Sequence, residues 1–134
     1  MITFGRMVVL VDDYEQASAF YVGTLGLTVA ADLVAGERRY LHLTFPGQEP
    51  VGLWLMKAET EADVASIGRQ AGDQPCGVLY TEDIHAEHRR LAEAGVAFSG
   101  PPVAAEGSIH AHFSDPFGNV FVLVQITAKG GTRP

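Results

Sequence analysis

The chain has 134 residues, 47% of them hydrophobic and 19% charged, a size and composition typical of one globular domain or two small half-domains. Nine basic residues against 16 acidic ones give a formal net charge of −7 without a basic run, which argues against nucleic-acid binding. The single cysteine, Cys76, excludes an internal disulfide and a cysteine-built metal site.

The first half of the chain predicts a strand, a helix and three further strands. The β-branched run 7–11 indicates a strand, and Asp13 is an N-cap with Gln16 as its capping-box partner. Apolar residues then recur at helical spacing as far as Leu25, and Gly26 ends the helix. Three strands are expected at 27–34, 38–45 and 51–56.

The second half repeats this order about 70 residues later. Its predicted elements are a strand at 77–81, a helix at 84–94 with Asp83 as its N-cap, and strands at 96–99, 108–114 and 119–125. Three features recur in the same order in both halves: a helix cap, a glycine that ends the helix, and a histidine-containing strand before a turn. We therefore predict one domain, 1–134, composed of module one (1–56), a linker with a marginal helix (57–75), module two (76–126) and a frayed tail (127–134).

Two motifs carry a resemblance to a known superfamily. They are Asp13-x6-Phe20-Tyr21-x3-Leu25-Gly26-Leu27 and Asp115-Pro116-Phe117-Gly118-Asn119. With them the chain resembles the vicinal-oxygen-chelate superfamily of glyoxalase I, extradiol dioxygenases and bleomycin-resistance proteins over residues 4–126. The resemblance implies an α+β fold in which two tandem βαβββ modules form a curled mixed sheet around a cavity, often completed by a homodimer.

Enzymes of this superfamily hold a divalent metal with His, Gln or Glu from the first and last strands of the modules. Counted from the motifs, these positions fall on Arg6, on Gly52 or Leu53, on Cys76 and on Val122. Arginine has no lone pair to donate, and valine has no donor atom. We therefore expect no metal and no other cofactor, and we assign no catalytic residue.

Strand alternation predicts which side chains face the cavity. Tyr40 and His42 share parity in one strand, as do His110 and His112 in its counterpart. Three imidazoles could in principle bind a transition metal. Because no carboxylate joins them, the favoured interpretation is that they line a ligand pocket or hydrogen-bond to neighbouring residues.

Two further residues have two interpretations each. Trp54, the only tryptophan, either fills the core or offers its indole to a planar aromatic ligand. Arg6 pairs either with a ligand carboxylate or phenolate, or with a neighbouring acid. The predicted ligand-binding residues are Arg6, Tyr40, His42, Trp54, His110, His112 and Val122.

The leading functional hypothesis is a metal-independent protein that binds a small molecule and confers resistance by sequestering it. A planar aromatic or glycosylated antibiotic, or a metabolite, would be the ligand. The alternative is a glyoxalase- or dioxygenase-like enzyme using a non-standard histidine site, and an accessory subunit with a vestigial cavity is a third hypothesis. With no signal peptide and no apolar run near the roughly 20 residues of a membrane span, we expect a cytoplasmic homodimer without membrane or nucleic-acid partners.

Overall fold

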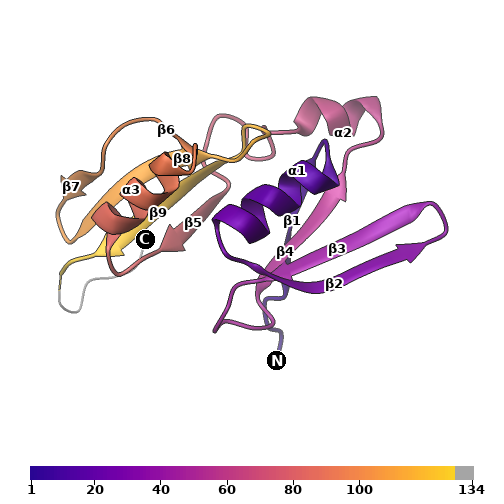
Figure 1. Ribbon diagram of the computed structural model, residues 1–134, viewed down its shortest axis with the longest axis horizontal. Helices are drawn as coiled ribbons and strands as arrows, with labels where there is room; N and C mark the ends of the chain where they lie inside the picture. Colours follow the sequence, from indigo (N-terminus) through magenta and orange to yellow (C-terminus); the bar gives the residue numbers. More distant parts are fainter. Residues whose placement is uncertain (129–134) are drawn as a thin grey trace. The chain divides into compact units, whose positions relative to one another are not determined.

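The computed structural model describes residues 1–128, and the chain divides into two compact units, unit 1 (Met1–Gln70) and unit 2 (from Ala71 onward). Each unit contains one mixed β-sheet with a helix on one face (Figure 1). The predicted α+β class is confirmed. The hydrogen-bonded strands form two separate sheets, one in each unit, rather than the single curled sheet suggested by the sequence.

Unit 1 follows the predicted order of strand, helix and three strands. Its elements are β1 (Arg6–Val11), α1 (Tyr14–Ser18), the π-helix η1 (Ala19–Thr24), β2 (Thr28–Ala35), β3 (Arg38–Thr44), β4 (Gly52–Lys57) and α2 (Glu61–Ser66). The strand order is β1-β4-β3-β2, in which β1 and β4 are parallel and the other pairs are antiparallel.

The helix predicted after Asp13 is present, but its second half is a π-helix. The Asp13 carboxylate caps its start as expected, accepting a hydrogen bond from the backbone N–H of Gln16 at 2.8 Å. Further along, the N–H of Leu25 donates to the carbonyl of Phe20, five residues back, at 2.9 Å. The spacing of hydrophobic residues in the sequence does not distinguish a π-helical turn from an α-helical turn.

Strand alternation builds the core of unit 1 against this helix. Buried side chains come from alternate positions of three strands and from the helical segment: Val9, Val11, Ala17, Phe20, Tyr21, Leu41, Leu43, Leu53 and Leu55. The residues between them in the strands point to the opposite face of the sheet, and this face carries the candidate site.

The predicted linker contributes one short helix, α2. The hydroxyl of Thr60 caps it by accepting a hydrogen bond from the backbone N–H of Asp63 at 3.1 Å. The helix has no buried residue, in agreement with the marginal helix predicted here.

The end of the same segment covers one edge of the sheet. The side-chain amide of Gln70 accepts a hydrogen bond from the N–H of Leu10 at 2.8 Å and donates to the carbonyl of Val8 at 3.0 Å. It thereby occupies backbone groups of β1 that a further strand would otherwise use. This contact gives a physical reason why β1 ends its sheet.

Unit 2 contains β5 (Gly77–Tyr80), α3 (Ile84–Glu93), β6 (Ala97–Phe98), β7 (Val103–Ala105), β8 (Ser108–Ser114) and β9 (Val120–Ile126). The strand order is β5-β9-β8-β6, and β7, which the sequence did not predict, also pairs with β8. The core joins α3 to the sheet through Ile84, Leu91, Ala111, Phe113, Phe121 and Leu123.

The chain beyond β9 was predicted to fray from residue 127. Thr127 and Ala128 instead donate backbone hydrogen bonds to the carbonyl of Gly107, at 2.9 and 3.3 Å. The rest of the predicted tail, 129–134, lies outside the described residues. Within the described part of the chain, no helix has the length and apolar character needed to cross a membrane.

Candidate functional site

The candidate site lies on the face of the unit 1 sheet opposite α1. Three rows of side chains cross this face from β1 through β4 to β3. In the first row, Gly52 of β4 lies between Arg6 of β1 and Thr44 of β3. In the second row, Trp54 of β4 lies between Val8 of β1 and His42 of β3. In the third row Leu10 is opposite Met56, and continuing the register places Met56 beside Tyr40. We call these residues the aromatic face.

Three rings of this face lie against one another, with Trp54 stacked on His42 and tilted against Tyr40. The ring centroids of Trp54 and His42 are 5.0 Å apart with an interplanar angle of 24°, and those of Trp54 and Tyr40 are 6.0 Å apart at 33°. All three side chains are partly exposed. Trp54 therefore belongs to the aromatic face and does not fill the core, whereas its role towards a ligand stays a prediction.

The register also corrects the predicted counterpart of Val122 in the first half of the chain. His42 is opposite Trp54, and its counterpart His112 is opposite Val122. The equivalent of Val122 is therefore Trp54, and neither Gly52 nor Leu53. The count from the motifs failed because the loop 45–51 is longer than the corresponding loop 115–119.

Gly52 is required by a close approach of two strands. A Cβ atom on Gly52 would lie 1.8 Å from the carbonyl oxygen of Leu43, a distance that no real structure tolerates. The first row of the aromatic face therefore has no side chain between Arg6 and Thr44. The glycine thus keeps the strands close and the arginine unobstructed on this face.

Arg6 is only partly satisfied by the fold. One terminal nitrogen of its guanidinium donates to the backbone carbonyl of Pro50, whereas its Nε is buried without a hydrogen-bond partner. Among residues 1–128, no carboxylate forms an ion pair with Arg6. The interpretation in which Arg6 pairs with a neighbouring acid is thus not supported by the described part of the chain.

The surroundings of His42 favour its neutral form. Burial, and secondarily the positive charge of Arg6, lower the pKa of His42 below its ordinary value of 6.5. The imidazole is therefore neutral near pH 7 and both donates and accepts hydrogen bonds.

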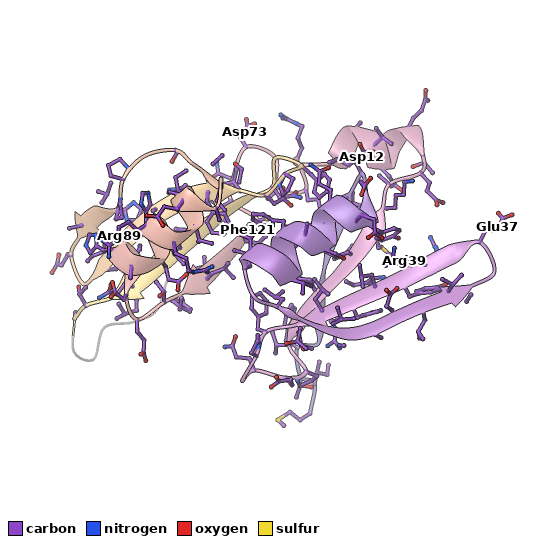
Figure 2. The ribbon with its side chains drawn as sticks, viewed as in Figure 1. Asp12, Glu37, Arg39, Asp73, Arg89 and Phe121 are labelled. Atoms are coloured by element: carbon purple, nitrogen blue, oxygen red, sulfur yellow. The ribbon has the colours of Figure 1, made fainter. Side chains whose placement is uncertain are left out.

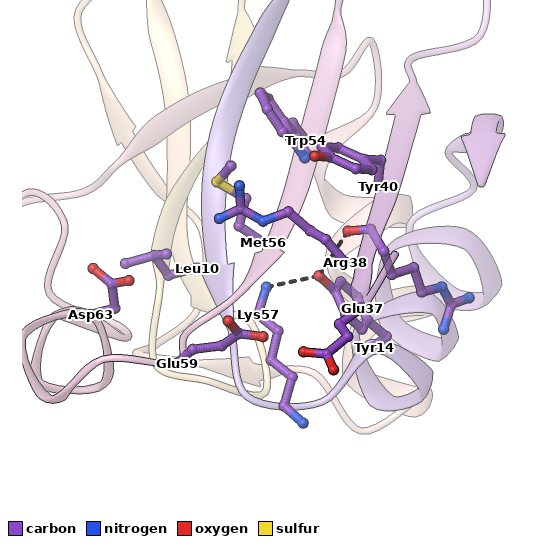
Figure 3. Close-up of a pocket in the computed structure, with 11 residues that line it drawn as sticks. Leu10, Tyr14, Glu37, Arg38, Tyr40, Trp54, Met56, Lys57, Glu59 and Asp63 are labelled. Carbon is purple, nitrogen blue, oxygen red and sulfur yellow. Dashed lines mark hydrogen bonds between the residues drawn. The ribbon is translucent and has the colours of Figure 1, made fainter. Parts of the chain in front are cut away.

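A pocket of about 270 Å³ opens at the Tyr40 end of the aromatic face (Figure 3). Figure 3 shows the rings of Trp54 and Tyr40 side by side and the Arg38 side chain extending towards Met56. Its lining residues are Leu10, Tyr14, Glu37, Arg38, Arg39, Tyr40, Trp54, Met56, Lys57, Glu59 and Asp63. The volume is close to the lower end of the roughly 300–1,000 Å³ typical of small-molecule pockets.

One wall of this pocket is fixed by Arg39, which is labelled in Figure 2. Its guanidinium forms two hydrogen bonds of 2.9 Å with the Asp32 carboxylate and one of 3.1 Å with Glu15. It also lies 5.1 Å from the ring centroid of Tyr14, whose hydroxyl bonds to the Arg39 carbonyl and to the N–H of Lys57. These contacts join β3 to α1 and β4, and they neutralise the charge of Arg39.

The residues at this end of the site are absent from the set predicted from the sequence. Arg38 and Met56 have the same strand parity as Tyr40 and Trp54, so extending the alternation by two residues would have identified both. Glu59 and Asp63 come from outside the strands, and no periodic pattern indicates them.

The remaining predicted site residues lie together on unit 2. His110 and His112 are on β8 with ring centroids 5.7 Å apart at 86°, and Val122 on β9 is opposite His112. Val78 and Tyr80 of β5 are on the same face and are exposed. The predicted set thus forms two groups, one on each sheet.

The side chains at the positions inferred for the superfamily's metal do not fit a metal. Arg6 and Trp54 in unit 1 offer no lone pair suited to a divalent cation, and Val122 in unit 2 offers none. Burial, with a smaller effect of Asp115, raises the pKa of Cys76 and keeps its thiol protonated. Within residues 1–128, the structure contains no group of three or more His, Cys, Asp or Glu placed to hold a metal ion.

A βαβββ arrangement in unit 1, repeated in unit 2 with the short extra strand β7, and a ring-lined sheet face define a protein of the class suggested by the sequence motifs. The chain belongs to the Glyoxalase/Bleomycin resistance protein/Dioxygenase superfamily, whose family model matches residues 3–123. The resemblance stated from the motifs is confirmed.

Relatives cover nearly the whole chain. An uncharacterized protein of Shewanella frigidimarina is 30% identical over 126 residues, covering 92% of this chain and 93% of the relative. Among solved structures, UcmS2 is 30% identical with a TM-score of 0.82, covering 92% of this chain and 98% of UcmS2. TnmS3, an antibiotic binding protein from Streptomyces sp. CB03234, is 31% identical with a TM-score of 0.77, covering 95% and 98% of the two chains.

Proposed function

We propose that this protein is a metal-independent binding protein that sequesters a planar aromatic small molecule, such as an antibiotic or a metabolite. The observation that carries the proposal is the partly exposed stack of Trp54 on His42, with the ring of Tyr40 tilted against it, beside a pocket of about 270 Å³. A flat ligand placed on this stack continues a ring arrangement that the protein has already formed, so little side-chain ordering is needed on binding.

Two further observations support this function over a metalloenzyme. The side chains at the implied metal positions do not suit a metal, and the similar structure TnmS3 is an antibiotic binding protein. Sequestration requires affinity and no chemical step, so it needs neither a nucleophile nor a general base.

Stacking alone limits the binding free energy to a few kcal/mol. A three-ring ligand that removes about 200 Å² of apolar surface from water gains about 5 kcal/mol. That free energy corresponds to a Kd of roughly 0.2 mM, before the cost of association is subtracted. Useful sequestration therefore needs a polar contact in addition to the stack.

We also propose that the protein works as a homodimer in the cytoplasm. The edge strand β2 carries the exposed apolar side chains Val29, Leu33 and Val34, which a second copy would cover. A single partly buried thiol suits a reducing compartment. Light scattering after gel filtration tests the dimer: a mass near 14.3 kDa, that of one chain, would exclude it.

The function is tested by calorimetric titration with a panel of planar aromatic and glycosylated antibiotics. We expect at least one ligand to bind more tightly than millimolar, with an affinity at least tenfold weaker in Trp54→Ala. Phe4→Ala is the matched control, because Phe4 is an exposed aromatic residue of the same unit outside the sheet, and it should leave the affinity unchanged.

The fate of the ligand separates sequestration from catalysis. Mass spectrometry after overnight incubation should recover the ligand chemically unchanged and in stoichiometric amount with the protein. Conversion of the ligand by substoichiometric protein would favour the enzyme hypothesis. Failure of every ligand in the panel to bind more tightly than millimolar would exclude the proposed function.

A further inference from the structure

We infer that the ligand of the aromatic face is an acidic planar aromatic molecule, whose carboxylate or phenolate oxygen binds Arg6 while its ring stacks on Trp54. The inference rests on the proposed function and specifies the chemical class of the ligand. It also assigns Arg6 as the residue that determines this specificity.

The Arg6 side chain has few hydrogen-bond partners within the fold. A guanidinium carries five N–H donors, and among residues 1–128 its hydrogen-bond acceptor is the carbonyl of Pro50. The buried Nε has no partner. A buried N–H donor without a partner costs free energy, and an oxygen atom of an anionic ligand that reaches the guanidinium would remove part of that cost.

Arg6 lies next to Trp54 and His42 on the aromatic face. Arg6 occupies the row of the aromatic face next to that of Trp54 and His42, separated from Thr44 by the side-chain-free Gly52. Its charge is close enough to lower the pKa of His42. An oxygen substituent on a ring that stacks on Trp54 therefore has a cation within reach in the same face.

Three other cations of unit 1, Arg38, Arg39 and Lys57, line the pocket at the end of this face. Arg39 is neutralised by Asp32 and Glu15. Arg38 and Lys57 line the pocket together with three carboxylates, those of Glu37, Glu59 and Asp63. Arg6 does not line this pocket and has no acidic partner among the described residues. An anionic ligand group at Arg6 is therefore repelled less by neighbouring carboxylates than one at the pocket.

The net charge of −7 does not oppose this assignment. Charges on a protein surface are screened over about 8 Å at physiological ionic strength, whereas a contact between a guanidinium and a carboxylate is direct. The local charge at Arg6 therefore decides the preference of the bound ligand, and the overall charge mainly slows the approach of anions.

The test uses two ligands with the same rings and a different charge, anthracene-2-carboxylate and anthracene-2-carboxamide, with affinities measured by calorimetry at pH 7.5. We expect the wild-type protein to bind the carboxylate at least tenfold more tightly than the carboxamide. Arg6→Gln should bring this ratio close to one, and Arg6→Lys should give an intermediate ratio because it keeps the charge without the planar fork.

Arg89→Gln is the control for net charge, because Arg89 is an exposed arginine of α3 in unit 2, and its ratio should equal that of the wild type. Thermal unfolding confirms that each variant is folded. If Arg6→Gln does not fold, the inference is judged from the affinity ratios of Arg6→Lys and of the wild type. Equal binding of both ligands by the wild type, or an unchanged ratio in the Arg6 variant, would overturn the inference while leaving the proposed function intact. Absence of binding for both ligands would reject the stacking function and this inference with it.

Discussion

Trp54 and His42 are opposite each other on β4 and β3, and their rings are stacked with centroids 5.0 Å apart. The pair couples the optical signal of the only tryptophan to a titratable group. Because Arg6 and burial both disfavour the imidazolium form, His42 stays neutral at pH 7 and takes up a proton only under more acidic conditions.

We predict that Trp54 fluorescence falls on acidification with a midpoint below 6.5, the ordinary pKa of histidine, because imidazolium quenches an indole on which it stacks. The folded-state pKa of His42 is lower than its unfolded-state pKa. Its stability contribution is therefore fully present above about pH 6.5 and is lost as the pH falls through the folded-state pKa. Fluorescence titration and urea unfolding at a series of pH values measure both effects.

Two variants separate the causes. His42→Gln should remove the fluorescence transition, and Arg6→Gln should move its midpoint upwards, because the repulsion from the guanidinium is gone. A wild-type midpoint above 6.5 would contradict the environment described for this residue.

We predict that Gly52→Ala destabilises the protein by about 3 kcal/mol or more, because its Cβ would collide with the backbone of Leu43, which cannot move away as a side chain would. Gly5→Ala is the matched control, since a Cβ there has no neighbour within 4 Å. Urea unfolding measures both changes. A Gly52→Ala protein as stable as the control would mean that the two strands are not held in this close approach.

The sequence was sufficient for the order of the elements because local signals agree with the tertiary fold. The caps at Asp13 and Asp83 are used as predicted, with their carboxylates accepting hydrogen bonds from residues three positions later. Strand parity placed Tyr40 and His42 on the face opposite the core. These properties depend on residues close together in the chain.

The parts that the sequence could not predict depend on contacts between distant residues. The counterpart of Val122 was misplaced because loop length, and not strand pattern, sets the register of β4. Strand β7 has only three residues, too few for a periodic signal. The contact of Gln70 with β1 spans 60 residues and leaves no local trace.

We predict that Cys76 reacts slowly with thiol reagents in the folded protein. Burial, and to a smaller extent the negative charge of Asp115, raise the pKa of Cys76, so the reactive thiolate is scarce at pH 7.5. Labelling with a chromogenic disulfide should be at least tenfold faster in denaturant than in buffer. Equal rates in the two conditions would show that the thiol is as accessible as in the unfolded chain.

We predict that Asp115→Ala destabilises unit 2 by about 3 kcal/mol. The Asp115 carboxylate accepts hydrogen bonds from the N–H groups of Phe117 and Asn119 and from the Asn119 side chain, at 2.9, 2.8 and 2.8 Å. Both Asp115 and Asn119 are buried, so removing the acceptor leaves donors without partners. Urea unfolding measures the loss, and Glu106→Ala, an exposed acidic residue of the same unit, should change stability little.

We predict that Gln70→Ala increases amide hydrogen exchange at Leu10 and lowers stability by about 1–2 kcal/mol, because each lost hydrogen bond contributes about 1 kcal/mol. Gln70→Glu should be more harmful, since a carboxylate cannot donate to the Val8 carbonyl and would face it with like charge. Gln48→Ala, in the loop before β4, is the control and should leave the exchange at Leu10 unchanged. If Gln70→Glu were as stable as the wild type, the amide of Gln70 would not be what covers this edge. The variants then also show whether an uncovered β1 promotes self-association, because free edge strands pair with other chains.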